Sequence, residues 1–188
     1  PPLIFSNKKS NLEIIGGTAN PLAPPAADIK EVFLWHLDKL GININLEIEK
    51  EGFYPKGGGK IKIEINSCKE IKEVKLCEPA KERHKTTKII AVCSKELQKR
   101  DIAKRLIKGF KSDFPAEYKV ETEEKYIETL SPGCYIHANY QYGDCKFGMS
   151  ILGEIDRKAE EGGSECAIKL LEEIKSGGNT DHFTADQL

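Results

Sequence analysis

The feature that most constrains the fold is a change of hydrophobic period between residues 29 and 65. Apolar side chains first recur every three or four positions, which is typical of one face of an amphipathic helix. They then recur at every second position in residues 44–48 and 61–65, which indicates two half-buried strands. A short apolar run at residues 12–15 predicts a strand before the helix. Residues 12–66 therefore predict a β-α-β-β unit, and its helix carries the apolar stripe Ile29, Val32, Phe33, His36, Leu37 and Leu40.

A second unit is expected after a charged, weakly hydrophobic stretch at residues 69–88. Its pattern predicts a strand, a helix, three further strands and a final helix. The strands are expected at residues 88–93, around 118–122, 135–142 and 147–152. The inward positions are Ile102, Ala103, Leu106, Ile107 and Phe110 in the first helix, and Ile155, Ala159, Ala167, Leu170, Leu171 and Ile174 in the second.

The charged stretch also predicts a domain boundary near residue 80. We expect an α/β (α+β) fold in which residues 1–80 form one domain and residues 81–178 form a smaller α/β domain. Residues 179–188 would then return the chain to the first domain. Because the chain starts without an initiator Met and stops where a helical pattern has barely begun, we expect a piece of a longer protein.

Composition excludes several classes of protein. Hydrophobic residues make up 39% of the 188 residues, so a chain disordered throughout is excluded. The 29 basic and 30 acidic side chains exclude a uniformly polycationic nucleic-acid coat. Apolar runs fall far short of the ~20 residues of a membrane span, and no signal-peptide pattern opens the chain. We therefore expect a cytoplasmic protein that does not contact a membrane.

The six cysteines are scattered without a CxxC pair, which indicates reduced thiols rather than a disulfide framework. The nearest group with zinc-ligand chemistry is Cys134, His137 and Cys145, but its alternating neighbours are typical of sheet positions. We expect no metal site formed by these residues.

Two glycine-rich segments are candidates for phosphate binding. Gly52 and Gly57 begin the spacing of a P-loop, but Gly58 stands where that motif needs lysine, and a strand rather than a helix follows. The segment at residues 16–18 is better placed, because a strand, a glycine turn and a helix N-terminus together can cradle an anion. A plain connection between strand and helix is the alternative.

A basic segment is the strongest candidate for contact with RNA phosphates. Seven cations lie between residues 95 and 111, against two acidic residues. The alternative is the solvated face of an amphipathic helix. The candidate RNA contacts are Arg100, Lys104, Arg105 and Lys108.

None of the four histidines has a catalytic partner that the sequence reveals. His36 lies on the apolar stripe of its helix and His137 lies in a strand pattern, so both are predicted to be structural. His84 lies in the charged linker and His182 in the terminal segment, neither beside a nucleophile or a base at a known spacing. No Ser/His/Asp or Cys/His arrangement can be read from the chain.

Three motifs point to a known family through their order and spacing. Residues 16–28 contain GGT, then APP, then Asp28; residues 52–59 read GFYPKGGG; residues 185–188 read ADQL. Together they resemble the RNA 3'-terminal phosphate cyclase family, over nearly the whole chain. The resemblance implies repeated modules of parallel helices over a four-stranded sheet, with a smaller α/β domain inserted. The β-α-β-β unit is similar to one repeat and the second unit to the insert, and the chain would return to the repeat domain from Asp181 onward.

The resemblance also implies an activity. Family members use ATP to adenylate a histidine, pass AMP to an RNA 3'-phosphate, and let the neighbouring 2'-OH attack to give a 2',3'-cyclic phosphate. ATP with a divalent cation, Mg²⁺ or Mn²⁺, and RNA with a 3'-terminal phosphate are therefore the expected partners. The nucleophilic histidine of the family lies beyond Leu188, so we expect no catalytic residue in this chain and no complete reaction by it alone.

Part of an ATP site carries over from the family by position. Phe183 takes the place of an aromatic residue that stacks on adenine, Pro24 would pack on the other face of the base, and Asp186 would contact the nucleotide or its metal. Glycines of the first two motifs are expected to shape the backbone around the site. The implied ATP-binding residues are Phe183, Thr184, Ala185, Asp186, Gln187 and Pro24, and the shaping residues are Gly16, Gly17, Gly57, Gly58 and Gly59.

Two other readings stay open. Non-catalytic relatives of the cyclases bind RNA in ribosome assembly and keep the fold while departing from the nucleotide motifs. The intact segments at residues 52–59 and 185–187 favour the catalytic branch. Enolpyruvyl transferases share the repeated architecture, but their motifs are absent from this chain.

Overall fold

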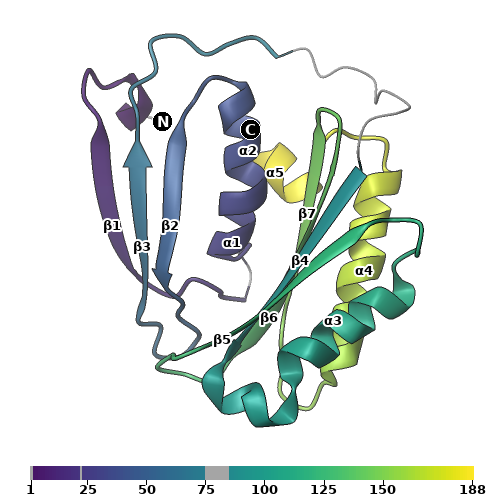
Figure 1. Cartoon of the computed structure of the whole chain (residues 1–188). Helices are drawn as coiled ribbons and strands as arrows, with labels where there is room; N and C mark the ends of the chain where they lie inside the picture. Colours follow the sequence, from purple (N-terminus) through teal and green to yellow (C-terminus); the bar gives the residue numbers. More distant parts are fainter. Residues whose placement is uncertain (1, 22, 75–84) are drawn as a thin grey trace.

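The computed structural model describes residues 2–21, 23–74 and 85–188, and it shows four layers in the order sheet, helix, sheet, helices (Figure 1). The predicted boundary near residue 80, as well as Cys77 and His84, lies outside the described residues. Among the described residues, no helix combines the length and the apolar character that a membrane span requires.

The first module has the predicted β-α-β-β order. Its helical segment runs without a break from Ala26 to Lys39, and the middle of it is a π-helical turn. In the described residues its sheet has three antiparallel strands, in the order β1-β3-β2, and not the four that the resemblance implied. The elements are η1 (Pro2–Phe5), β1 (Ser10–Gly16), α1 (Ala26–Asp28), η2 (Ile29–Phe33), α2 (Leu34–Lys39), β2 (Ile44–Lys50) and β3 (Gly59–Ile65).

Strand register explains why the helix packs on this sheet. Leu12, Ile63 and Leu46 are neighbours across the three strands, so the alternating apolar positions gather on one face. Leu37 and Leu40 of the helical stripe share a hydrophobic cluster with Ile63 of β3. The apolar residues of the helical pattern and of the alternating strand pattern therefore meet where this helix packs on this sheet.

The second module is a four-stranded sheet covered by two helices. Its strand order is β5-β4-β6-β7, with β4 and β5 parallel and the other pairs antiparallel. The short helix at the end of the chain follows the second of the covering helices. The elements are β4 (Lys85–Ser94), η3 (Lys95–Arg100), α3 (Ile102–Asp113), β5 (Val120–Ile127), β6 (Cys134–Tyr142), β7 (Cys145–Leu152), α4 (Ala159–Lys175) and α5 (His182–Gln187).

Three details differ from the expected pattern. The strand expected around residues 118–122 starts at Val120 and continues to Ile127. The inward placement of Ile155 was wrong: this side chain is 94% exposed, because α4 begins only at Ala159. Asp101 adopts a left-handed backbone conformation with φ of 51°, and it divides the basic segment into the 3₁₀ turn η3 and the helix α3.

Helices α3 and α4 bury one face of the second sheet. Leu106 and Phe110 from α3 and Leu170 from α4 pack on Ile136 of β6, and all four are buried. The two helices approach closely because α4 has a glycine at the crossing: a Cβ on Gly163 would overlap the backbone oxygen of Leu106.

The other face of the second sheet is covered by the helix of the first module. Ala27 from α1 and Phe53 from the β2–β3 connection share a buried cluster with Val92 of β4 and Tyr135 of β6. The helix that packs on the first sheet therefore packs on the second sheet as well (Figure 1).

Candidate functional site

The structure brings the two glycine-rich segments together. Thr18 N–H donates to the Gly52 carbonyl oxygen at 2.9 Å, and Gly52 N–H donates to the Thr18 hydroxyl at 3.0 Å. A Cβ on Gly52 would lie 2.7 Å from the Gly16 carbonyl oxygen, and one on Gly59 would lie 2.6 Å from Thr18 Cγ2. The two motifs thus form one unit in which backbone touches backbone, and side chains at Gly52 and Gly59 would not fit.

The predicted shaping glycines are not equivalent. Gly57 and Gly58 adopt left-handed conformations with φ of 61° and 74°, which favour glycine. Gly16 has open space where a Cβ would stand, and at Gly17 a Cβ would meet only the side chain of Asn20. The turn at residues 57–59 therefore needs its glycines for geometric reasons, whereas nothing in the described residues requires a glycine at position 16.

Glu51 links this glycine unit to the second module, a contact that the sequence did not predict. Its carboxylate accepts hydrogen bonds from the Thr18 hydroxyl and, at 2.7 Å, from the Tyr135 hydroxyl. Burial raises the pKa of Tyr135, and the neighbouring Glu51 charge raises it further. Phe53 packs on the same tyrosine, with ring centroids 6.2 Å apart. In β6, Tyr135 lies on the opposite face of the sheet from the core residues Ile136 and Ala138. An aromatic residue on that face is the sequence signal that could have pointed to this contact.

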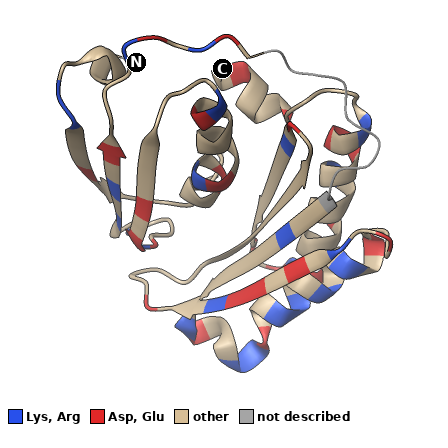
Figure 2. Cartoon of the chain, turned by 45° about the horizontal axis from the view of Figure 1, so that its top comes forward, with Lys and Arg blue, Asp and Glu red and all other residues tan. Residues whose placement is uncertain are grey.

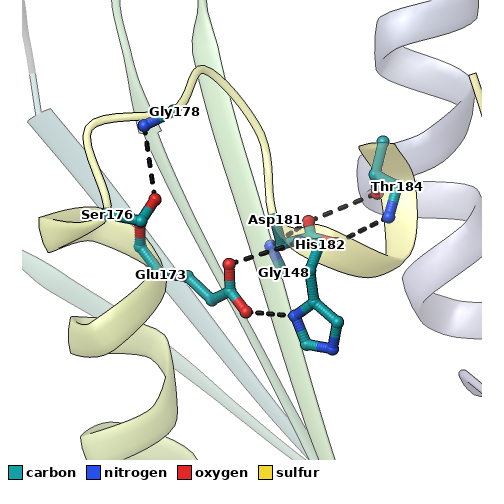
Figure 3. A network of polar contacts seen from close by, with 7 residues as sticks. All are labelled: Gly148, Glu173, Ser176, Gly178, Asp181, His182 and Thr184. Carbon is teal, nitrogen blue, oxygen red and sulfur yellow. Dashed lines mark hydrogen bonds and ion pairs between the residues drawn. The ribbon is translucent and has the colours of Figure 1, made fainter. Parts of the chain in front are cut away.

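The segment expected to bind ATP begins at a buried anchor. Asp181 precedes α5 and caps it, because Thr184 N–H donates to Oδ1 at 2.8 Å (Figure 3). Asp181 Oδ2 accepts the Gly148 N–H of β7 at 2.9 Å and the Thr184 hydroxyl at 3.2 Å. A completely buried carboxylate therefore fixes α5 to the edge strand of the second sheet.

The residues of α5 differ in what they leave accessible. Thr184 is buried and its hydroxyl belongs to the cap, so the structure gives it an anchoring role. Ala185, Asp186 and Gln187 are exposed, and the Phe183 ring is 43% exposed. Contact of these residues with a nucleotide stays a prediction.

The expected stacking of adenine between Phe183 and Pro24 also stays a prediction. Pro24 lies before α1, where the long helix begins. Figure 1 places α5 beside α2, farther along the same helix.

His182 has an acidic partner that the sequence analysis did not find. Its Nδ1 pairs with the Glu173 carboxylate, and its backbone N–H donates to Glu173 Oε2 at 3.2 Å (Figure 3). The partner lies near the end of α4, so the loop that leads into α5 brings the two residues together.

A second buried polar group lies between the helix of the first module and the second sheet. Asp28 is 5% exposed, and its Oδ1 lies 3.3 Å from His137 Nδ1, which is also 2.8 Å from Ser150 Oγ. Burial, with a smaller contribution from Asp181, raises the pKa of Asp28 to about 7. Burial also lowers the pKa of His137 to about 3, with a further contribution from Lys146. His137 is therefore neutral near pH 7, and Asp28 titrates there.

The helix and strand positions predicted for His36 and His137 are confirmed, and both side chains are buried. His36 Nε2 lies 3.0 Å from the Lys146 carbonyl oxygen of β7, and burial lowers the pKa of this imidazole. His137 lies on the face of β6 opposite to Cys134, since successive residues of a strand alternate. The zinc-like trio of the sequence therefore does not converge.

The candidate RNA contacts separate into two groups. Arg105 forms a two-pronged ion pair with Glu160 of α4, with both nitrogen–oxygen distances 2.8 Å, so it is committed to holding α3 against α4. Arg100, Lys104 and Lys108 are exposed, and no ion pair engages them within the described residues. Figure 2 shows the basic residues along η3 and α3, with acidic residues on the neighbouring strand β5.

A cavity of about 630 Å³ lies between the two modules, where the sequence predicted no site. Its walls come from β2, the start of the long helix and the strands β4, β5 and β6. Charged residues of both signs line it, including Lys30, Lys88, Glu31 and Glu121. None of the predicted ATP-binding residues contributes to its walls.

Comparison with known proteins identifies the family. A model of the family described as RNA 3'-terminal phosphate cyclase matches residues 1–188. The chain belongs to the RNA 3'-terminal phosphate cyclase family. It is 31% identical over 189 residues to the RNA 3'-terminal phosphate cyclase of Pyrococcus abyssi, 32% over 180 residues to that of Thermococcus kodakarensis, and 30% over 197 residues to that of Desulfurococcus amylolyticus.

The match to these cyclases covers 95–100% of this chain but only 51–54% of each relative. The chain thus spans about half the length of the curated relatives that it matches. Family membership agrees with the three motifs at residues 16–28, 52–59 and 185–188, and with the mixed α/β fold.

Proposed function

We propose that the protein containing this chain is an ATP-dependent RNA 3'-terminal phosphate cyclase. One observation supports the proposal most: the family motifs at residues 16–18 and 52–59 meet in direct backbone contact, through the paired hydrogen bonds of Thr18 and Gly52. Such tight packing of two glycine segments beside a helix start is the kind of geometry that lets a backbone approach a phosphate group closely.

The proposed reaction has three steps. A histidine attacks the α-phosphate of ATP and displaces pyrophosphate, then the AMP group passes to the terminal phosphate of the RNA. The adjacent 2'-OH attacks that activated phosphate and releases AMP, which leaves a 2',3'-cyclic phosphate. A covalent intermediate divides one difficult displacement into easier ones. Mg²⁺ or Mn²⁺ would accompany ATP and offset the charge of its phosphates.

Within this proposal, the chain supplies part of the nucleotide site and not the nucleophile. The exposed carboxylate of Asp186 and the half-exposed ring of Phe183 are available for contact with ATP or its metal ion. The cap formed by Asp181 would hold them in place. The nucleophilic histidine is proposed to lie outside residues 1–188.

The test is the mass of the intact protein after incubation with ATP and Mg²⁺, on residues 1–188 and on the longer protein in parallel. We expect an added AMP group on the longer protein alone. RNA ending in a 3'-phosphate should then be converted to a product that resists phosphatase, and the same RNA with a 3'-OH is the control.

Two other outcomes would contradict parts of this proposal. An adduct on residues 1–188 would place the nucleophile inside them, and His182 beside Glu173 would be examined first. No adduct and no conversion would favour a non-catalytic, RNA-binding relative.

A further inference from the structure

Two cysteines face each other across neighbouring strands of the second module. Cys93 is the next-to-last residue of β4, Cys134 is the first residue of β6, and the antiparallel register makes them direct partners. Neither takes part in a disulfide in this structure. The two thiols are therefore placed where a cross-strand disulfide could form.

The backbone hydrogen bonds show which type of pair this is. Ser94 N–H donates to the Gly133 carbonyl at 2.8 Å, so the next pair along the ladder is hydrogen-bonded. The Cys134 carbonyl accepts from Gly153 N–H on the β7 side, also at 2.8 Å. In an antiparallel ladder, hydrogen-bonded and non-bonded pairs alternate, so Cys93 and Cys134 form a non-hydrogen-bonded pair.

This type of pair suits a disulfide. Its Cα atoms are typically ~4.5 Å apart, at the short end of the range of about 4.4–6.8 Å that disulfides span. The two side chains also lie on the same face of the sheet, since both pack with the cluster under α3. Gly153 leaves the room that the Cys134 sulfur occupies, because a Cβ there would overlap that sulfur.

The two thiols have different environments. Cys93 is completely buried, whereas Cys134 is partly exposed. The neighbouring Cys134 thiol raises the pKa of Cys93, where burial adds to the effect, and the neighbouring Cys93 thiol lowers the pKa of Cys134. Cys134 is thus the more accessible thiol and the one more readily ionised.

We propose that Cys93 and Cys134 form a reversible cross-strand disulfide, with Cys134 as the thiol that reacts first. With glutathione disulfide as oxidant, the Cys134 thiolate attacks one sulfur, forms a mixed disulfide and releases one glutathione thiolate. Cys93 then loses its proton and attacks the Cys134 sulfur, which closes the protein disulfide and releases the second glutathione. The protein dithiol is oxidised by two electrons and glutathione disulfide is reduced to two thiols.

A disulfide between Cys93 and Cys134 would lie beside the contact between the second module and the β2–β3 connection. Gly133, next to Cys134, lies against Phe53, and a Cβ there would overlap the Phe53 ring. Tyr135, on the other side of Cys134, binds Glu51. The disulfide would therefore tie the two strand ends together at the place where the second module contacts the β2–β3 connection.

The experiment is oxidation of the chain in buffers of increasing glutathione disulfide over glutathione, followed by alkylation and peptide mapping. We expect a peptide pair joined through Cys93 and Cys134 before any other cysteine is modified. Closing a loop of about 40 residues should raise the midpoint of thermal unfolding by roughly 10 °C, and dithiothreitol should reverse the shift.

Single variants test the order of the two steps. Cys93→Ser should accumulate glutathione on Cys134, because the resolving thiol is missing, whereas Cys134→Ser should leave Cys93 unmodified. Cys68→Ser, which removes a partly exposed thiol of the first module, is the matched control and should oxidise like the parent chain. Oxidation of other cysteines first, or no Cys93–Cys134 bond at any ratio, would overturn the proposal.

Discussion

Asp28 and His137 show how burial sets the charge of single residues in this protein. The pKa of Asp28 is higher in the folded chain than its usual value of 3.8, so the folded state holds this proton more tightly than the unfolded state. The contribution of Asp28 to the free energy of unfolding therefore falls as pH rises from about 4 to 7. His137 acts in the opposite direction, because its pKa is lowered from 6.5 to about 3 and its contribution rises with pH in that window.

Asp28→Asn separates the two contributions. The variant cannot ionise at this position, so its stability relative to the parent chain should increase between pH 4 and pH 8, by up to about 4 kcal/mol. Urea unfolding of both proteins across this range gives the difference directly. Parallel stability curves would show that Asp28 carries no such penalty.

Asp181 and Asp186 are a matched pair of carboxylates with opposite predicted roles. Asp181→Ala removes the cap of α5 and the bond to Gly148, and it should lower the free energy of unfolding by about 2–3 kcal/mol. Hydrogen exchange should increase along α5 in this variant. Asp186 is exposed, so Asp186→Ala should leave the thermal midpoint within about 2 °C and weaken ATP binding instead.

The reverse pattern would overturn these assignments. If Asp186→Ala destabilised the fold as much as Asp181→Ala, the exposed end of α5 would be structural and unavailable to a nucleotide. Thermal unfolding with and without ATP, measured on both variants in the longer protein, distinguishes the two cases.

At the scale of elements, adjacent glycines of α4 test the contact between α3 and α4. A Cβ on Gly163 would overlap the Leu106 carbonyl, whereas one on Gly162 would lie 3.5 Å from the Leu106 side chain, an ordinary contact. Gly163→Ala should therefore destabilise the chain by about 1–3 kcal/mol. Gly162→Ala should be neutral or stabilise by up to about 1 kcal/mol, because alanine favours a helix over glycine. Equal thermal midpoints would contradict the close crossing.

Most elements could be predicted from the sequence because their apolar residues follow a clear period. The stripe from Ile29 to Leu40 and the alternation at residues 44–48 correspond to the long helix and to β2. The inward position predicted for Ile155 was wrong because this residue is in phase with the helix although the chain there is still in a turn. The local pattern predicted the three strands that the described residues of the first sheet show, whereas the fourth strand was expected only from the family resemblance.

Less of the candidate site could be predicted than of the fold. The glycine motifs and the segment containing Asp186 stand out as sequence, but their partners do not. Glu51 with Tyr135, and His182 with Glu173, are brought together by tertiary structure across long or irregular connections. Arg105 looked like a free cation, and only packing of α4 on α3 shows that Glu160 holds it.

At the scale of the whole molecule, charge is distributed unevenly despite the formal net charge of −1. Lys104→Glu with Lys108→Glu should weaken binding of single-stranded RNA and lower the salt slope of the affinity by about one unit or more. Lys8→Glu with Lys72→Glu makes the same change of charge on exposed residues of the first module, and is the control. Equal slopes for both double variants would assign the cations of α3 to solvation.

The helix from Ala26 to Lys39 lies between two sheets that belong to different modules. The same helical segment therefore covers one face of each sheet, and we expect neither module to fold autonomously. Excising the second module would leave Ala27 and Phe53 facing water, while excising the first would uncover Val92 and Tyr135. Two regions that resemble separable domains along the chain should thus melt in one cooperative transition.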